Sequence, residues 1–92
     1  MPGIVRLGDM AVHGCFGPHY PLVGSPNVTV DGKPVIIKNT PYSPHTCGDE
    51  THTGVAVGGG TVFCNDQPVQ KVGDKVSCGS TMVEGSGSVS IG

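Results

Sequence analysis

Two similar stretches of the sequence end in residues that commonly bind metals. RLGDMAVHG (6–14) and KVGDKVSCG (71–79) align almost residue for residue, and His13 in the first corresponds to Cys78 in the second. Imidazole nitrogen and thiolate sulfur are both ligands of borderline metal ions such as zinc. An exchange of one for the other preserves a metal-binding role, so the pair predicts that both loops contribute to one metal site.

Two further histidines complete a coordination set. His45 ends a third copy, IIKN…SPH, which has Asn39-Thr40 in place of Gly-Asp and reaches its histidine one residue late. His52, in HTCGDETH (45–52), is the expected fourth donor. Three imidazoles and one thiolate form a closed tetrahedral shell for one Zn²⁺ and leave no position for water or substrate. The set therefore predicts a structural metal site, and its mixed nitrogen and sulfur donors favour zinc over iron.

Neighbouring residues offer alternatives to this set. Either Cys15 or Cys47 could replace His52 as the fourth donor, or the two cysteines could form a disulfide under oxidising conditions. Asp49 and Glu50 carry oxygen donors, although a solvated loop is the better interpretation for them. The sequence leaves these alternatives open.

Two other residues with reactive side chains are expected to stay outside the site. His19, in GPHYP, has no counterpart in the similar stretches and is expected to be an ordinary loop residue. Cys64 aligns with Val30 and is expected to be a buried thiol.

The N-terminus, MPGIVRLGD, does not resemble a secretory signal peptide. This predicts synthesis in the cytoplasm, where cysteines are more often thiols than disulfides.

The elements that must position these residues are short strands. GSPNVTVDGKPV (24–35) and GGGTVFCNDQPV (58–69) match at an offset of 34 residues, and GSGSVSIG (85–92) follows as a third, shorter copy. Alternating NVTV, an Asp31-Gly32 turn of type I′ and a second apolar run predict a hairpin, which Asn65-Asp66 repeats. We therefore predict an all-β fold with three similar units and pseudo-threefold symmetry, whose loop ends meet near the axis.

Size and composition narrow the function. The length of 92 residues predicts one domain, and a core this small needs an additional cross-link for stability. The 16 Gly and 8 Pro residues are consistent with short strands joined by tight turns. With five Lys and Arg residues in total and a net charge of −2, the sequence predicts no basic face that could bind nucleic acid. No apolar run is long enough to span a membrane. No G-x-S-x-G, H-E-x-x-H or P-loop motif occurs, so an enzyme is not expected.

The ordered combination of motifs resembles the PAAR-repeat proteins, which cap the trimeric spike of type VI secretion systems and contractile phage tails. The resemblance rests on R-L-G-D…H-G, G-S-P-N-V…D-G-K-P-V, V-G-D-K-V-S-C-G and G-S-G-S-V-S-I-G and covers essentially the whole chain. It implies one PAAR-repeat domain over residues 1–92 without an extension domain. It also implies a pointed cone with one structural Zn²⁺ near its apex, held by His13, His45, His52 and Cys78.

The resemblance also implies partners and a mechanical function. The broad base would sit on a trimeric β-helical spike protein of the VgrG type, through apolar strand residues for which Val28, Val30, Val62, Val89 and Ile91 are candidates. The protein would sharpen the spike, help it to puncture a target membrane, and attach effector proteins non-covalently for delivery. It would leave the cytoplasm on the spike tip.

Three alternatives to a secretion-system tip remain at this point. The same role in a contractile phage tail fits the sequence equally. A small zinc or thiol redox protein would have labile metal and exposed, reactive cysteines. A minimal hydrolase would need an open zinc site with three protein ligands and a water molecule, so the number of protein ligands separates it from a structural site.

Overall fold

The chain forms short strands, as the sequence predicts. We describe it from a computed structural model that defines residues 2–14, 16–25 and 27–91. Within these ranges there are strands and turns but no helix, and hence no helix that could cross a membrane. The strands are β1 (Ala11–His13), β2 (Phe16–His19), β3 (Thr29–Val30), β4 (Lys33–Pro34), β5 (Pro41–Cys47), β6 (Glu50–Val55), β7 (Phe63–Cys64), β8 (Gln67–Pro68) and β9 (Thr81–Met82). The predicted all-β fold is confirmed.

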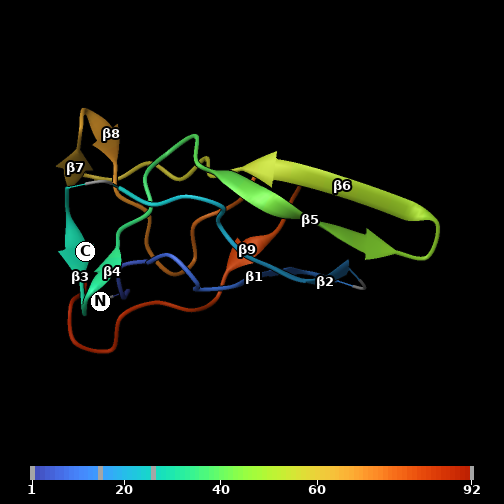
Figure 1. Cartoon of the computed structure of the whole chain (residues 1–92), viewed down its shortest axis with the longest axis horizontal. Coiled ribbons are helices and arrows are strands. Elements are labelled where there is room, and N and C mark those ends of the chain that lie inside the picture. The colour runs from blue at the N-terminus through green and yellow to red at the C-terminus, as the bar shows by residue number, and fades with distance from the viewer. Residues whose placement is uncertain (1, 15, 26, 92) are drawn as a thin grey trace.

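The strands pair only with antiparallel neighbours. One sheet has the order β2-β1-β9, and the remaining strands form the hairpins β3–β4, β5–β6 and β7–β8. The molecule is elongated, with extents of 37 × 22 × 22 Å. Figure 1 shows β3–β4 and β7–β8 at one end, with both chain termini, and the turn of β5–β6 at the other. We call the first end the base and the second the tip.

Turn residues with positive φ close the two hairpins of the base. Asp31 and Gly32 have φ of 55° and 78°, and Asn65 and Asp66 have φ of 52° and 65°. A type I′ turn requires positive φ at both central positions, which Gly, Asn and Asp tolerate best. The predicted hairpins are therefore confirmed.

The third hairpin of the base is made by the two ends of the chain. Ile4 N–H donates to the Val89 carbonyl at 3.1 Å, and Ile91 N–H donates to the Pro2 carbonyl at 2.9 Å. Gly3 and Ser90 form an antiparallel bridge between them. The C-terminal copy of the repeat, around residues 89–91, thus pairs with residues 2–4, which act as its return strand. This pairing joins the first unit to the last.

A ring of main-chain hydrogen bonds shows the pseudo-threefold axis directly. Val5 N–H donates to the Gln70 carbonyl at 3.0 Å, Gln70 N–H to Ile36 at 2.8 Å, and Ile36 N–H to Val5 at 3.1 Å. The bonds run in one rotational sense and return to their starting residue. A second set of three bonds joins the units in the opposite rotational sense, from Leu7 N–H to the Pro34 carbonyl, Lys38 N–H to Pro68 and Val72 N–H to Gly3, at 2.8, 3.0 and 2.9 Å.

Two apolar clusters pack along this axis. The cluster nearer the base consists of Ile4, Val35, Cys64 and Val69. The second contains repeat-equivalent side chains from all three units, namely Val5 with Ile36, and Ala11 with Tyr42 and Val76. Its members are at most 1% exposed. The turn of β5–β6 lies beyond both clusters, so the tip needs another source of rigidity.

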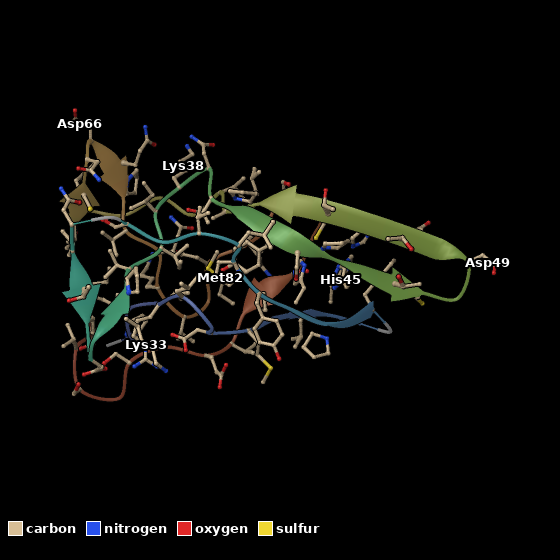
Figure 2. All side chains as sticks on the ribbon, in the orientation of Figure 1. Lys33, Lys38, His45, Asp49, Asp66 and Met82 are labelled. Atoms are coloured by element: carbon tan, nitrogen blue, oxygen red, sulfur yellow. The ribbon has the colours of Figure 1, made fainter. Side chains whose placement is uncertain are left out.

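The tip departs from threefold symmetry. In the middle unit, β5 and β6 form a hairpin that projects past the loops of the other two units (Figure 1). The three loop ends at His13, His45 and Cys78 come together as expected, but the hairpin of the middle unit extends beyond them. Figure 2 places His45 along the length of the molecule between Met82, in the second cluster, and Asp49, at the hairpin turn.

Candidate metal centre

Four side chains from three separate segments converge between the second cluster and the tip. His13 ends β1, His45 lies in β5, His52 lies in β6, and Cys78 lies in the turn that follows Val76. One donor atom from each of the four lies within 4.8 Å of the donors of the other three. We call these four residues the metal group. They are the residues that the sequence predicts as zinc ligands, and together they could hold a metal ion.

An irregularity in β5 turns His45 toward the group. The Cα partners are Tyr42 with Gly54 and His45 with His52, so the register shifts by one residue between Tyr42 and His45. Such a β-bulge adds one residue to one strand and reverses which face the following side chains occupy. Tyr42 and His45 are both buried although they are three residues apart, and Pro44 is exposed. His45 comes one residue later in its repeat than His13 and Cys78 do in theirs, and the bulge accommodates this extra residue.

Hydrogen bonds orient two of the four donors. His45 Nδ1 lies 2.7 Å from the Gly17 carbonyl. A carbonyl only accepts, so the proton sits on Nδ1 and the lone pair on Nε2 is free to bind a metal. His45 Nε2 lies 2.6 Å from His52 Nε2 and 3.9 Å from Cys78 Sγ. The buried Ser80 hydroxyl lies 3.2 Å from Cys78 Sγ, where it can donate to a thiolate.

The donor set fits a tetrahedral ion. In a tetrahedron with bonds of about 2.0 Å to nitrogen and 2.3 Å to sulfur, neighbouring donors lie roughly 3.3–3.8 Å apart. The separations of 2.6 and 3.9 Å bracket this range, so shifts of less than about 1 Å would centre an ion among them. The Nδ1 of His13 is buried and has no hydrogen-bond partner among the described residues. Four protein donors fill the shell, which suits a structural role.

An aromatic side chain that the sequence analysis did not select packs against the group. The ring of Phe16 stacks on His52 with a centroid separation of 4.0 Å, and lies 4.9 Å from His45 and 5.2 Å from His13. It is thus in contact with all three imidazoles of the group. No repeat copy or motif marks Phe16, and only its position in β2 beside β1 reveals it.

His19 is not the ordinary loop residue that the sequence predicts. It ends β2, is 1% exposed, and stacks on His45 with 3.8 Å between ring centroids and 7° between ring planes. Its Nδ1 lies 2.9 Å from the Ser43 carbonyl. Burial lowers the pKa of His19 below its usual 6.5, so the ring is neutral near pH 7 and can lie flat on its neighbour. The prediction failed because His19 has no repeat partner, and its neighbours are near only in space.

The cysteines divide into separate roles. Cys64 is buried in the cluster near the base, and Val30, its counterpart in the repeat, packs against the same cluster, as predicted. Cys47 is disulfide-bonded, whereas the sequence favoured thiols and kept a disulfide as an alternative, and its sulfur is thus unavailable as a thiolate ligand. Cys64 and Cys78 are thiols. The alternatives that involve Cys15 concern a residue outside the described ranges.

The acidic residues of the hairpin turn lie outside the metal group. Asp49 and Glu50 are exposed, and the Glu50 carboxylate comes no closer than 3.9 Å to His52 Nδ1. This agrees with the interpretation of a solvated loop.

Comparison with known proteins identifies a family. No curated protein matches the chain at a significant level. The family model of the PAAR motif matches residues 22–84, which include β3 to β9 and three of the four members of the metal group. The match covers more than two thirds of the 92 residues, and the chain therefore belongs to the family of PAAR-motif proteins.

Proposed function

We propose that this protein is the tip of a contractile injection spike, seated on a trimeric β-helical spike protein of the VgrG type in a type VI secretion system. The PAAR motif supports a spike-tip function in general, and proteins of this family are structural rather than catalytic. The observation that carries the proposal is the threefold arrangement of the base, at the opposite end of the molecule from the turn of β5–β6 (Figure 1).

Three equivalent valines give the base its threefold character. Val28, Val62 and Val89 are 41%, 40% and 40% exposed. Each carbonyl accepts a main-chain bond from the return strand of its own hairpin, at 3.1, 2.8 and 3.1 Å respectively. A monomer with three near-identical contact elements about one axis can match the three subunits of a partner with true threefold symmetry. Phe63, at 59% exposure, adds apolar surface beside Val62.

The metal group supplies the rigidity that the tip lacks. We propose that His13, His45, His52 and Cys78 bind one Zn²⁺, which when bound cross-links β1, the β5–β6 hairpin and the turn at Cys78. These segments meet beyond the apolar clusters, and metal binding contributes folding free energy where burial of apolar surface cannot. A projecting hairpin tied at its root in this way would resist bending during penetration of a membrane.

The proposal has a direct test in the docking of the base. We expect one chain to bind per trimer of a β-helical spike protein, measured by native mass spectrometry and by light scattering after gel filtration. Val28→Asp or Val89→Asp would bury an unpaired charge in the interface and weaken binding at least tenfold, on the order expected for a central contact. Val57→Asp is the matched control, because Val57 is 41% exposed and lies beside Lys75 outside the base.

The outcomes also separate the two machines. Binding to a secretion-system spike but not to a phage-tail spike supports the proposal as stated, and the reverse places the protein in a phage tail. Equal loss of binding in the base variants and in Val57→Asp would contradict docking through the base. In either machine the protein would be made in the cytoplasm, carried outward on the spike, and would attach effectors non-covalently.

A further inference from the structure

Strands β2 and β5 belong to different sheets but are joined by a reciprocal pair of histidines. His19 Nδ1 lies 2.9 Å from the Ser43 carbonyl, and His45 Nδ1 lies 2.7 Å from the Gly17 carbonyl. Each histidine therefore bonds the carbonyl two residues before the other. Because both carbonyls are acceptors, both imidazoles carry their proton on Nδ1. The pair links the sheet that carries His13 to the hairpin that carries the rest of the histidine ligands.

The ring of His19 also restrains the ring of His45 from one face. The two planes are 7° from parallel with centroids 3.8 Å apart, which is van der Waals contact over the whole ring. Phe16 approaches His45 at 4.9 Å with a tilt of 30°. His45 is 6% exposed and His19 is 1% exposed. With its Nδ1 bonded and its ring flanked, His45 can direct Nε2 only toward His52 and Cys78.

The choice of histidine at this position is not explained by packing. The Nε2 of His19 is buried and has no hydrogen-bond partner among the described residues. A buried polar atom without a partner is unfavourable, so an apolar ring would fill the same space at lower cost. The features that only histidine combines here are the bond to the Ser43 carbonyl and a flat ring against His45.

We propose that His19 is a positioning residue of the metal centre, which holds the His45 ring and the β2 backbone so that His45 Nε2 faces the ion. The inference rests on the proposed metal site and extends it to a residue outside the metal group. His19 does not act as a ligand in this arrangement, because the four donors of the metal group already fill a tetrahedral shell without it. Partners of this kind fix ligand orientation, and their loss typically weakens metal binding about 10–100-fold.

Two substitutions separate the two contributions of His19. His19→Phe retains a ring that can stack but removes the donor to Ser43, and His19→Gln retains a donor but removes the stacked ring. We would measure the dissociation constant for Zn²⁺ by competition with a chromophoric chelator, and record the Co²⁺ spectrum of the full-length chain. We expect weaker zinc binding by about 10–100-fold in at least one variant, with a shifted Co²⁺ ligand-field spectrum.

A control distinguishes positioning from loss of stability. Val69→Ala removes buried methyl groups from the cluster near the base, far from the metal group, and should lower the unfolding temperature without changing zinc affinity or the Co²⁺ spectrum. If both His19 variants matched the wild type in affinity and spectrum, the inference would be overturned while the metal site stood. If the wild type bound neither ion, the proposed metal site would fail and the inference with it. If one variant failed to fold, the other would decide.

Discussion

At the scale of single residues, the departures from the repeat preserve its geometry. Asn39 replaces the glycine that stands at Gly8 and Gly73 in the other two units, and its φ of 74° lies close to their 96° and 98°. Asn is one of the few residues with a side chain that adopts this left-handed conformation readily. The middle copy therefore makes the same turn, although its sequence has lost the Gly-Asp pair.

The metal group makes a prediction at one residue. We expect plasma mass spectrometry to find about one zinc per chain in the wild type, and a loss of most of it in Cys78→Ala, because three donors remain where four closed the shell. Cys64→Ala is the control, since this buried thiol belongs to the cluster near the base. Equal zinc content in the wild type and Cys78→Ala would rule out Cys78 as a ligand.

The contacts of Asp31 predict how the stability of the fold depends on pH. Hydrogen bonds from the Ser86 and Ser88 hydroxyls, with the charge of Arg6, hold the pKa of Asp31 below its usual 3.8. A lowered folded-state pKa stabilises the fold above about pH 4, and this contribution is lost as the pH falls through the lowered value. We expect Asp31→Asn to destabilise the metal-free protein at pH 7 and to flatten its loss of stability toward pH 3, both measured by urea unfolding.

The equivalent turn provides the comparison for Asp31. Asp66 lies in the turn of β7–β8, and Asp66→Asn keeps a residue that tolerates its φ of 65°. Its stability should follow the wild type across the same pH range. Parallel curves for Asp31→Asn and the wild type would show that the Asp31 contacts contribute nothing to the acid response.

At the scale of elements, one hairpin supplies two of the four donors. β5 and β6 pair directly through His45 and His52, and the bulge in β5 sets the face on which His45 lies. The hairpin must also sit close to the turn that carries Cys78. A Cβ added to Gly54 would lie 2.7 Å from Val76 Cγ1 and 3.0 Å from the Cys78 nitrogen. Gly54 therefore permits the approach that brings the fourth donor to the other three.

Substitution of Gly54 tests whether the close approach of the hairpin to the turn at Cys78 matters for zinc binding. We expect Gly54→Ala to push β6 away from the 76–78 segment, to lower the unfolding free energy by about 1–3 kcal/mol, and to weaken zinc binding. Gly59→Ala is the control, because its Cβ would meet nothing within 4 Å. Urea unfolding of the metal-free chains and chelator competition measure the two effects separately. Normal zinc affinity in a destabilised Gly54→Ala would show that the close contact serves packing alone.

At the scale of the whole molecule, different forces hold the two ends. The base and middle contain both apolar clusters and the rings of main-chain bonds around the axis. The region near the tip contains the metal group and its stacked rings, and Figure 2 labels His45 of this group. Burial of apolar surface does not depend on metal, whereas metal-site cross-linking does. We therefore expect the base to remain folded without metal and the tip to depend on the proposed metal site.

Removal of metal tests this division. We expect a strong chelator to increase hydrogen exchange of the amides in β5 and β6. The amides that donate the bonds around the axis should stay protected, among them those of Ile36, Lys38, Gln70 and Val72. Cys78→Ala should give the same pattern without chelator, which excludes an effect of the chelator itself. A uniform loss of protection along the chain would show instead that base and tip unfold as one cooperative unit.

Much of the fold followed from the sequence because it depends on local patterns. Asp31-Gly32 and Asn65-Asp66 marked the turns through residues that adopt positive φ, and the offset of 34 residues marked the repeat. His13 and Cys78 emerged from the same repeat, since equivalent residues of similar units occupy equivalent places. The sequence by itself thus determined the all-β class, the three units and three members of the metal group, but it left the fourth open among His52, Cys15 and Cys47.

Only the tertiary structure decided how these parts meet. Three features join residues that no local sequence pattern connects. They are the bulge that turns His45 inward, the stacking of His19 and Phe16 on the histidine ligands, and the pairing of the N-terminal residues with the C-terminal copy. His19 shows the reason most clearly, because its partners Ser43 and His45 lie on a strand of another sheet. Contacts of this kind arise from the packing of separate elements, and packing is specified by the whole chain together.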